Sequence, residues 1–126
     1  MTQGDRKRID VALRRAESGT SSRIAVRIVS DTTLDTFERA KAEFIAGGMH
    51  AHPTANAALI LVAPNARAFT VLGDRVLHER VGQAFWDQIV AEMAAAFKSG
   101  TPTDAIVLGI DRLGDALHHH FTQVVS

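Results

Sequence analysis

The sequence of 126 residues contains no cysteine. This absence excludes disulfide bonds, thiolate catalysis and cysteine-ligated zinc. The chain also has no excess of charge of either sign, because 14 basic side chains balance 14 acidic ones. Proteins that bind nucleic acid or membrane surfaces usually carry a clear basic excess, so we expect no nucleic-acid partner.

A long apolar run is missing as well. The longest one, residues 57–64, is far shorter than the roughly 20 residues that cross a bilayer as a helix. The basic N-terminal segment is not followed by the apolar core of a secretory signal. We therefore expect a cytoplasmic protein without a transmembrane segment, folded as a single domain over residues 1–126.

Four segments show the spacing of apolar residues by three and four positions that is typical of amphipathic helices. They are residues 5–17, 33–46, 81–98 and 102–121. The third segment places a run of large side chains on its inner side, which we interpret as core: Phe85, Trp86, Ile89, Val90, Met93 and Phe97.

Helix-start signals support two of these segments. Asp31, Thr33 and Asp35 precede or open the second one and are candidate caps. Thr101 and Asp104 flank a proline at the start of the last helix. Threonine can cap the helix there, and an acidic residue is stabilised by the positive end of the helix dipole.

The first helix is basic on its polar side, where it carries Arg6, Lys7, Arg8, Arg14 and Arg15. We interpret these residues as a solvated face, with docking of an anion or an acidic partner as the alternative. The last helix ends in three consecutive histidines, residues 118–120. Because neighbouring residues on a helix point about 100° apart, three adjacent histidines chelate one ion poorly, and we expect an exposed helix end.

Three segments are predicted strands, at residues 24–29, 57–63 and 68–72. The second is apolar at every position, which is typical of a central strand buried on both faces. The element order αβαββαα makes the first two strands parallel, through a right-handed crossover, and the third antiparallel to the second. We predict an α/β fold, a three-layer α/β/α sandwich in which a small mixed sheet is flanked by about four helices.

This topology brings together residues that are far apart in the sequence. Two parallel strands begin at the sheet edge where the antiparallel third strand ends. Arg23, Asn56 and Asp74 are therefore predicted to converge there and are our candidate ligand-binding residues. The loops at the same edge contribute His50, His52 and His78.

Three interpretations of this edge stay open. Asp74 with His52 or His78 has the ligand types of a divalent metal site. Alternatively, Arg23 with the histidines holds a phosphate or a carboxylate, because guanidinium matches such oxyanions in a bidentate way. In the third interpretation Asp74 only accepts backbone N–H groups at a strand end, and the histidines lie on a solvated loop.

With these motifs in place, the chain resembles the TPM domain family, the family of the thylakoid-lumen acid phosphatase, and in particular its small stand-alone bacterial members. The resemblance covers residues from about Ile9 to Phe121 and depends on order and spacing rather than on one motif. The segments that carry it are AESGTSSRIAV, DTFERAKAEF, GMHAHPTANAALILVAPNARAFTVLGD, VGQAFWDQIVAEMAAAFKSG and GIDRLGDALHHHF.

The resemblance implies an α/β/α sandwich. It also implies a family in which acid phosphatase activity and binding of divalent cations, calcium in particular, are attributed to some members, while others act as accessory modules. This chain departs from the family pattern at Arg23, where an acid is usual, and at Ala57 and Val76, where glycine is usual. A base in place of an acid weakens the carboxylate-rich coordination that calcium needs.

Two functional hypotheses follow. The first is a non-catalytic TPM-type accessory module that binds a protein partner or a small anion at this sheet edge. The alternative is a divalent-metal-dependent acid phosphatase with Asp74 as the candidate catalytic residue, His52 or His78 as further metal ligands, and Arg23 on the phosphate oxygens.

Overall fold

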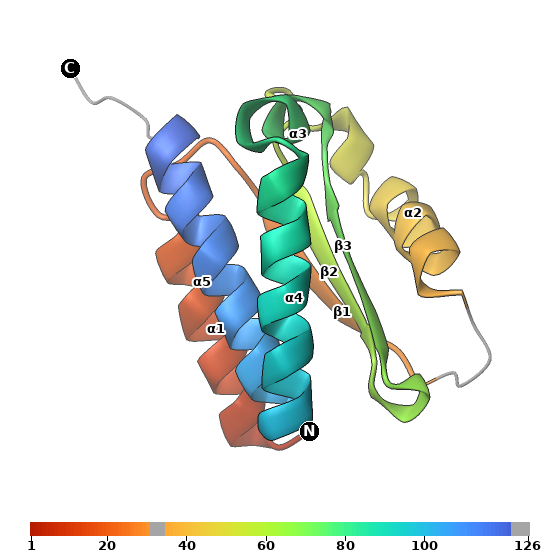
Figure 1. Cartoon of the computed structure of the whole chain (residues 1–126). Helices are drawn as coiled ribbons and strands as arrows, with labels where there is room; N and C mark the ends of the chain where they lie inside the picture. The colour runs from red at the N-terminus through yellow and green to blue at the C-terminus, as the bar shows by residue number, and fades with distance from the viewer. Residues whose placement is uncertain (31–34, 122–126) are drawn as a thin grey trace. The chain divides into compact units, whose positions relative to one another are not determined.

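The computed structural model of the chain describes residues 1–30 and 35–121 (Figure 1). These residues form five α-helices, two short 3₁₀ helices and three strands, which confirms the α/β class. In chain order the elements are α1 (Gln3–Glu17), β1 (Ile24–Ile28), α2 (Thr36–Ala46), η1 (Met49–Ala51), β2 (Ala58–Ala63), η2 (Pro64–Ala66), β3 (Ala68–Gly73), α3 (Arg75–Val81), α4 (Gln83–Ser99) and α5 (Pro102–Phe121).

The elements belong to two compact units. The helical unit consists of Met1–Ser22 and Val81–Ser126 and contains α1, α4 and α5. The sheet unit, Arg23–Arg80, contains the strands with α2 and η1. The expectation of one domain over the whole chain stays a prediction, and each unit is described by itself.

The sheet has the predicted topology. Its order is β1-β2-β3, with β1 parallel and β3 antiparallel to the central β2. All six side chains of β2 are buried, as the uninterrupted apolar run predicts. One face of the sheet carries a cluster of Leu59, Leu61 and small alanines, against which Met49 and the half-buried Phe44 pack.

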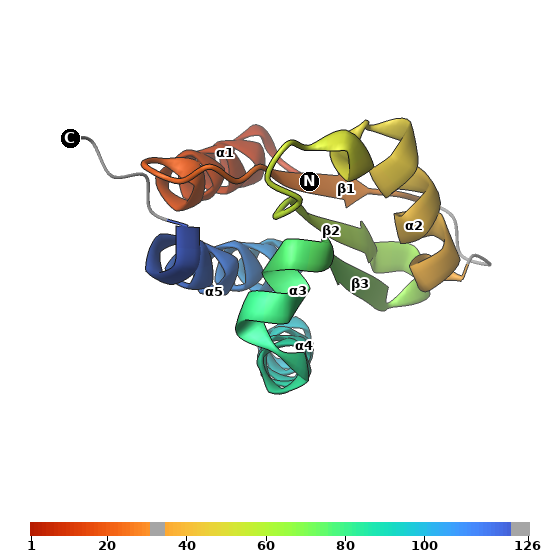
Figure 2. The same cartoon turned by 90° about the horizontal axis from the view of Figure 1, so that it is seen from above.

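Helix α2 covers this face of the sheet (Figure 2). It begins at Asp35, whose carboxylate accepts hydrogen bonds from the backbone N–H of Phe37 at 3.0 Å and of Glu38 at 3.3 Å. Asp35 is thus the cap, as predicted, whereas the other two candidates, Asp31 and Thr33, lie outside the described residues. Phe37 points to solvent and is 51% exposed; its ring lies 4.7 Å from the ammonium of Lys41.

In the helical unit, α1 and α5 run parallel to each other. Two ion pairs of 3.0 Å join them, Arg8 with Asp104 and Arg15 with Asp111. The partners are 96 positions apart in the sequence in both pairs, as expected for helices that run in the same direction. The helices approach each other closely where Gly114 faces Ala16: a Cβ atom at Gly114 would lie 2.8 Å from the Cβ of Ala16. Glycine is needed there for close packing.

Two predictions about the third helical segment need correction. The expected helix over residues 81–98 is α4, which begins after Gly82, where φ is +77°, and the preceding helix α3 was not predicted. Val90, which was expected on the inner side, is 43% exposed. The buried stripe of α4 is narrower than predicted and consists of Trp86, Ile89 and Met93. Within the described residues, no helix is both long and apolar enough to cross a membrane.

Candidate functional site

The predicted sheet edge lies wholly within the sheet unit and is built around Ala57. The carbonyl of Ala57 accepts a hydrogen bond of 2.8 Å from the backbone N–H of Asp74. On the other side, the N–H of Ala58 donates to the carbonyl of Arg23 at 2.9 Å. Extending the register of both ladders by one residue places Arg23 and Asp74 opposite Ala57, one on each side. Residues at one level of a sheet point to the same face.

Asp74 has one satisfied and one unsatisfied carboxylate oxygen. Its Oδ1 accepts a hydrogen bond of 2.7 Å from the backbone N–H of Arg75, and its carbonyl accepts from the N–H of His78 at 2.9 Å as α3 begins. Its Oδ2 is buried and has no hydrogen-bond partner within the described part of the chain. A buried carboxylate oxygen without a donor is costly, and such groups are rare unless a ligand or water completes them.

The loop before β2 holds a short relay of polar side chains. Thr54 Oγ1 donates to Asn56 Oδ1, and the same hydroxyl oxygen lies 3.0 Å from His52 Nδ1. Asn56 is fully buried. Next to it, Ala55 has a φ of +50°, an unusual value for a residue other than glycine. The N–H of Val76 donates to the Ala55 carbonyl at 2.9 Å and ties this loop to α3.

The direction of the relay determines the proton on His52. A threonine hydroxyl has a single proton, and here Asn56 Oδ1 accepts it. The tautomer of His52 that fits both contacts carries its proton on Nδ1, which then donates to Thr54 Oγ1. The contacts of Thr54 with His52 and Asn56 position the loop before β2.

The metal-ligand candidates do not form a complete set. Among the described residues, no group of three histidine or acidic side chains is arranged to hold a metal ion. Calcium takes six to eight oxygen ligands, most of them from carboxylates and carbonyls. This edge offers the carboxylate of Asp74 and, across Ala57, the cation of Arg23. The residues present do not fit a calcium site.

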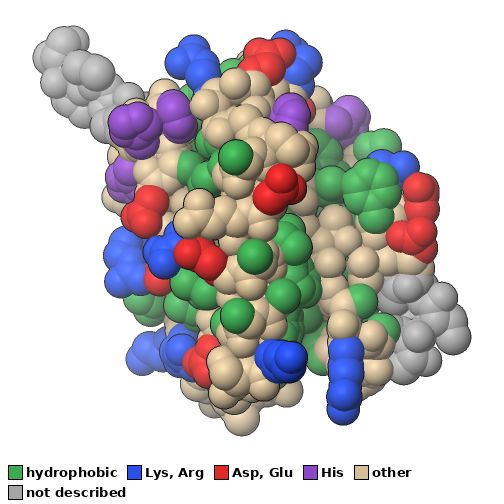
Figure 3. All heavy atoms as spheres, viewed as in Figure 1, with side chains coloured by type: hydrophobic (Ala, Val, Ile, Leu, Met, Phe, Trp, Pro, Cys, Tyr) green, Lys and Arg blue, Asp and Glu red, His purple; other side chains and the backbone are tan. Residues whose placement is uncertain are grey.

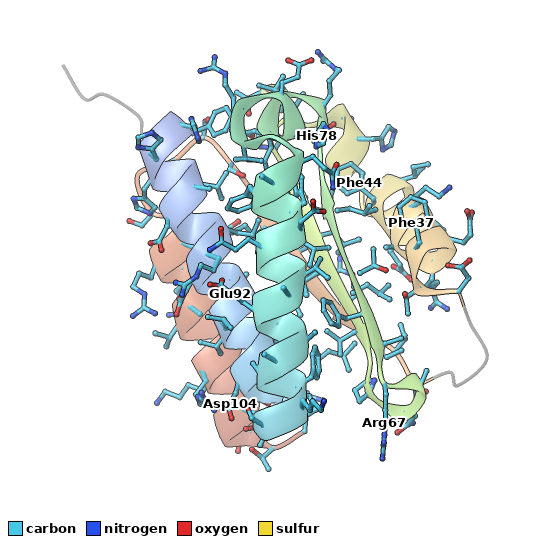
Figure 4. The ribbon with its side chains drawn as sticks, viewed as in Figure 1. Phe37, Phe44, Arg67, His78, Glu92 and Asp104 are labelled. Carbon is cyan, nitrogen blue, oxygen red and sulfur yellow. The ribbon has the colours of Figure 1, made fainter. Side chains whose placement is uncertain are left out.

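The structure thus brings Arg23, Asn56 and Asp74 to one edge, as the topology predicts. No ion pair joins Arg23 to Asp74 in the regions that the structure describes. The Asn56 side chain is engaged by Thr54, and direct contact of Asn56 with a ligand stays a prediction. Figure 4 shows His78 on α3, where it is exposed.

The sequence interpretation missed Thr54. Its signal is the alternation of polar residues at positions 52, 54 and 56, just before an entirely apolar strand. Polar side chains at every second position of a loop can contact one another along one side. The unsatisfied oxygen of Asp74 had no such signal, because the burial of one atom depends on tertiary packing.

The chain is similar to a known protein family and to several solved structures. A family model described as TPM domain matches residues 1–116. The BA42 protein of the psychrophilic bacterium Bizionia argentinensis, solved by NMR, is 31% identical, with a TM-score of 0.89 over 98% of this chain and 86% of its own. No curated protein matches the sequence.

Two more distant structures share the fold. The N-terminal domain of the cg2496 protein from Corynebacterium glutamicum is 15% identical, with a TM-score of 0.73 over 93% of this chain and 74% of that one. The N-terminal domain of a protein from P. gingivalis is 12% identical, with a TM-score of 0.82 over 100% and 83%. At these identities the likeness shows the fold alone.

Proposed function

This chain belongs to the TPM domain family, and we propose that it acts there as a non-catalytic module that binds a protonated oxyanion of the phosphate type. The proposed site is the sheet edge at Ala57, with Asp74 and Arg23 as the contacting side chains. The observation that carries the proposal is the buried Oδ2 of Asp74, which has no donor among the described residues.

The chemistry of the two side chains selects the ligand. An ionised carboxylate only accepts hydrogen bonds, so Asp74 Oδ2 needs a group that donates one. Arg23 is exposed and needs an anionic oxygen. Hydrogen phosphate offers both an O–H donor and anionic oxygens within one small group. Two strand spacings, about 10 Å between backbones, separate the two residues, and the long arginine side chain can reach into that gap.

The absence of an activated nucleophile supports a binding role. Thr54 is the hydroxyl side chain that contacts a histidine at this edge, and its proton is directed to Asn56. Asp74 Oδ1 is already engaged by the N–H of Arg75, which fixes the carboxylate. Together with the incomplete set of metal ligands, this arrangement supports holding an anion more than it supports cleaving a phosphate ester.

Sulfate distinguishes this site from a simple basic patch. It has the shape of phosphate, but at neutral pH it has no proton to donate. We expect phosphate to raise the melting temperature of the wild-type chain and sulfate at equal ionic strength to have little effect. A ligand at 100 times its dissociation constant stabilises a protein by about 2.7 kcal/mol, which a thermal-shift assay detects readily.

Asp74→Asn sharpens the test, because an amide can donate a hydrogen bond to sulfate. The variant is expected to lose the preference for phosphate over sulfate. Glu79→Gln, which removes an exposed carboxylate from α3, is the matched control and is expected to keep the preference. Equal responses to both anions in the wild-type chain contradict the proposal.

The phosphatase hypothesis has its own readout in the same experiment. Stabilisation by Ca²⁺ or Mn²⁺ that is lost in Asp74→Asn, together with turnover of p-nitrophenyl phosphate, would replace the binding proposal by the enzymatic one. No turnover together with phosphate-specific stabilisation supports the non-catalytic module.

A further inference from the structure

The surface of α1 in the helical unit has a groove that the proposed function does not use. A groove of about 360 Å³ follows α1 beside α5. Its floor is apolar and consists of Val11, Ala12 and Val107, and Val11 is 49% exposed. Its rim is cationic, with Lys7, Arg8 and Arg15 among the lining residues.

Four of the five basic residues of α1 lie on one side of the helix. At 100° per residue, Lys7, Arg8, Arg14 and Arg15 all lie within about 60° of Val11 around the helix axis, whereas Arg6 lies about 140° away. The acidic residues of α1, which are Asp5, Asp10 and Glu17, lie about 100° or more away. Figure 3 shows Lys and Arg side chains on the left of the molecule, with Asp and Glu side chains between them.

Two of the four cations are already paired. Arg8 and Arg15 form the ion pairs with Asp104 and Asp111 that join α1 to α5. Lys7 and Arg14 are exposed and form no ion pair with any described residue. The groove therefore keeps a positive charge next to an apolar floor.

We propose that this groove, lined by Lys7, Val11, Ala12 and Val107 and followed on α1 by the exposed Arg14, docks an acidic peptide segment of a protein partner that carries a large apolar side chain. Charge complementarity favours carboxylates opposite Lys7 and Arg14. The exposed Val11 and the concave floor favour an apolar anchor such as leucine. A lipid surface fits less well, because a bilayer does not fill a groove and a single exposed valine gives little insertion.

The test uses an acidic peptide of about a dozen residues, with uncharged ends and with two leucines one helical turn apart. A fluorescent label on the peptide allows titration with the whole chain by anisotropy. We expect saturable binding that weakens as salt is raised, because exposed charges are screened. The same peptide with serine in place of both leucines is expected to bind at least several-fold more weakly.

Variants of the chain locate the site. Lys7→Glu with Arg14→Glu leaves the two ion pairs to α5 intact and is expected to weaken binding roughly tenfold, since each reversal replaces attraction by repulsion. Val11→Ser is expected to weaken the leucine peptide but not the serine peptide. Lys98→Glu, an exposed residue of α4, is the matched control for charge and is expected to change nothing.

Several results would overturn this proposal. These are the absence of saturable peptide binding, equal binding of the leucine and serine peptides, and unchanged binding by the Lys7 and Arg14 double variant. Binding to vesicles rich in phosphatidylserine without binding to the peptide would assign the groove to a membrane surface instead.

Discussion

Arg23 and Asp74 flank Ala57 from the two strands that neighbour β2, and the two hydrogen bonds that set this register measure 2.9 and 2.8 Å. The two residues are 51 positions apart in the sequence and of opposite charge, yet no ion pair of described residues joins them. An unpaired cation and an unsatisfied carboxylate at one edge are suited to a ligand that has both an anionic oxygen and a donor.

A phosphate monoester provides a prediction about pH. The second pKa of a monoester is about 6, so above that pH the monoester loses the O–H group whose hydrogen bond Asp74 Oδ2 would accept. Phosphoserine is expected to bind more tightly at pH 5.5 than at pH 7.5, by roughly tenfold, while the affinity for inorganic phosphate changes less. Calorimetric titration at both pH values measures this difference. An affinity for phosphoserine that rises with pH would argue against a donor to Asp74.

Thr54→Val tests the relay that holds the loop. The variant leaves the Oδ1 atom of the buried Asn56 without its threonine donor. The loss of a hydrogen bond at a buried polar group costs about 1–3 kcal/mol of unfolding free energy. Thr54→Ser keeps the hydroxyl and is expected to cost well under half as much. Urea unfolding of both variants compares them; similar losses would mean that methyl packing, and not the hydroxyl, matters.

Gly114→Ala tests the close approach of α1 and α5. The new Cβ atom would lie 2.8 Å from the Cβ and 3.0 Å from the Cα of Ala16, neither of which can rotate away. Overpacking costs about 1–3 kcal/mol, and the higher helix propensity of alanine returns up to about 1 kcal/mol. A net loss of stability is expected. In an Ala16→Gly background the same change is expected to cost less, and a purely additive double variant would contradict the contact.

Arg67 offers a stabilising substitution. It lies in the turn between β2 and β3 with a φ of +52°, and it is exposed (Figure 4). The left-handed conformation costs a residue with a side chain about 1–2 kcal/mol, and glycine has an entropic penalty of about 0.5–1 kcal/mol. Arg67→Gly is expected to raise the unfolding free energy by about 0.5–1 kcal/mol, whereas Arg67→Ala, which keeps the strain, gives no gain. A loss of stability with glycine would contradict this prediction.

The loss of stability at low pH depends on the contacts of Asp104 at the start of α5. The backbone N–H of Thr101, followed by the Arg8 guanidinium, holds the pKa of Asp104 below its ordinary value of 3.8. A lowered folded-state pKa stabilises the fold above the ordinary value, and this contribution is lost as the pH falls through the folded value. Asp104→Asn is therefore expected to flatten the fall in urea midpoint below about pH 4.

Asp10→Asn is the control for that comparison. Asp10 is exposed on α1 and forms no hydrogen bond or ion pair with the described residues, so the substitution changes the net charge by the same amount. If both variants lose stability with pH in the same way as the wild-type chain, the contacts of Asp104 do not contribute as described.

The sequence predicts the position of the edge site because topology alone determines it. Once the first two strands are parallel and the third is antiparallel, Arg23 and Asp74 lie at the same edge of the sheet, on either side of β2. The direction of the relay from His52 and the burial of Asp74 Oδ2 are not predictable in this way. They depend on the backbone of the loop at Ala55, where a positive φ is adopted by a residue that rarely has one.

Periodicity likewise predicts which side of a helix is buried but not how wide the buried stripe is. Val90 lies at the margin of the inner side of α4 and is exposed, whereas Met93 in its centre is fully buried. The break at Gly82 shows the same limit, since glycine is compatible with a helix interior as well as with a turn.

The most direct test of the central claim is a ¹⁵N NMR titration of the wild-type chain with inorganic phosphate, repeated with sulfate. The account predicts saturable shifts at the backbone amides of Arg23, Ala57, Asp74 and Arg75 with phosphate, and little change there with sulfate. Shifts that are absent, that are equal for both anions, or that lie away from this edge would contradict the assignment of the site.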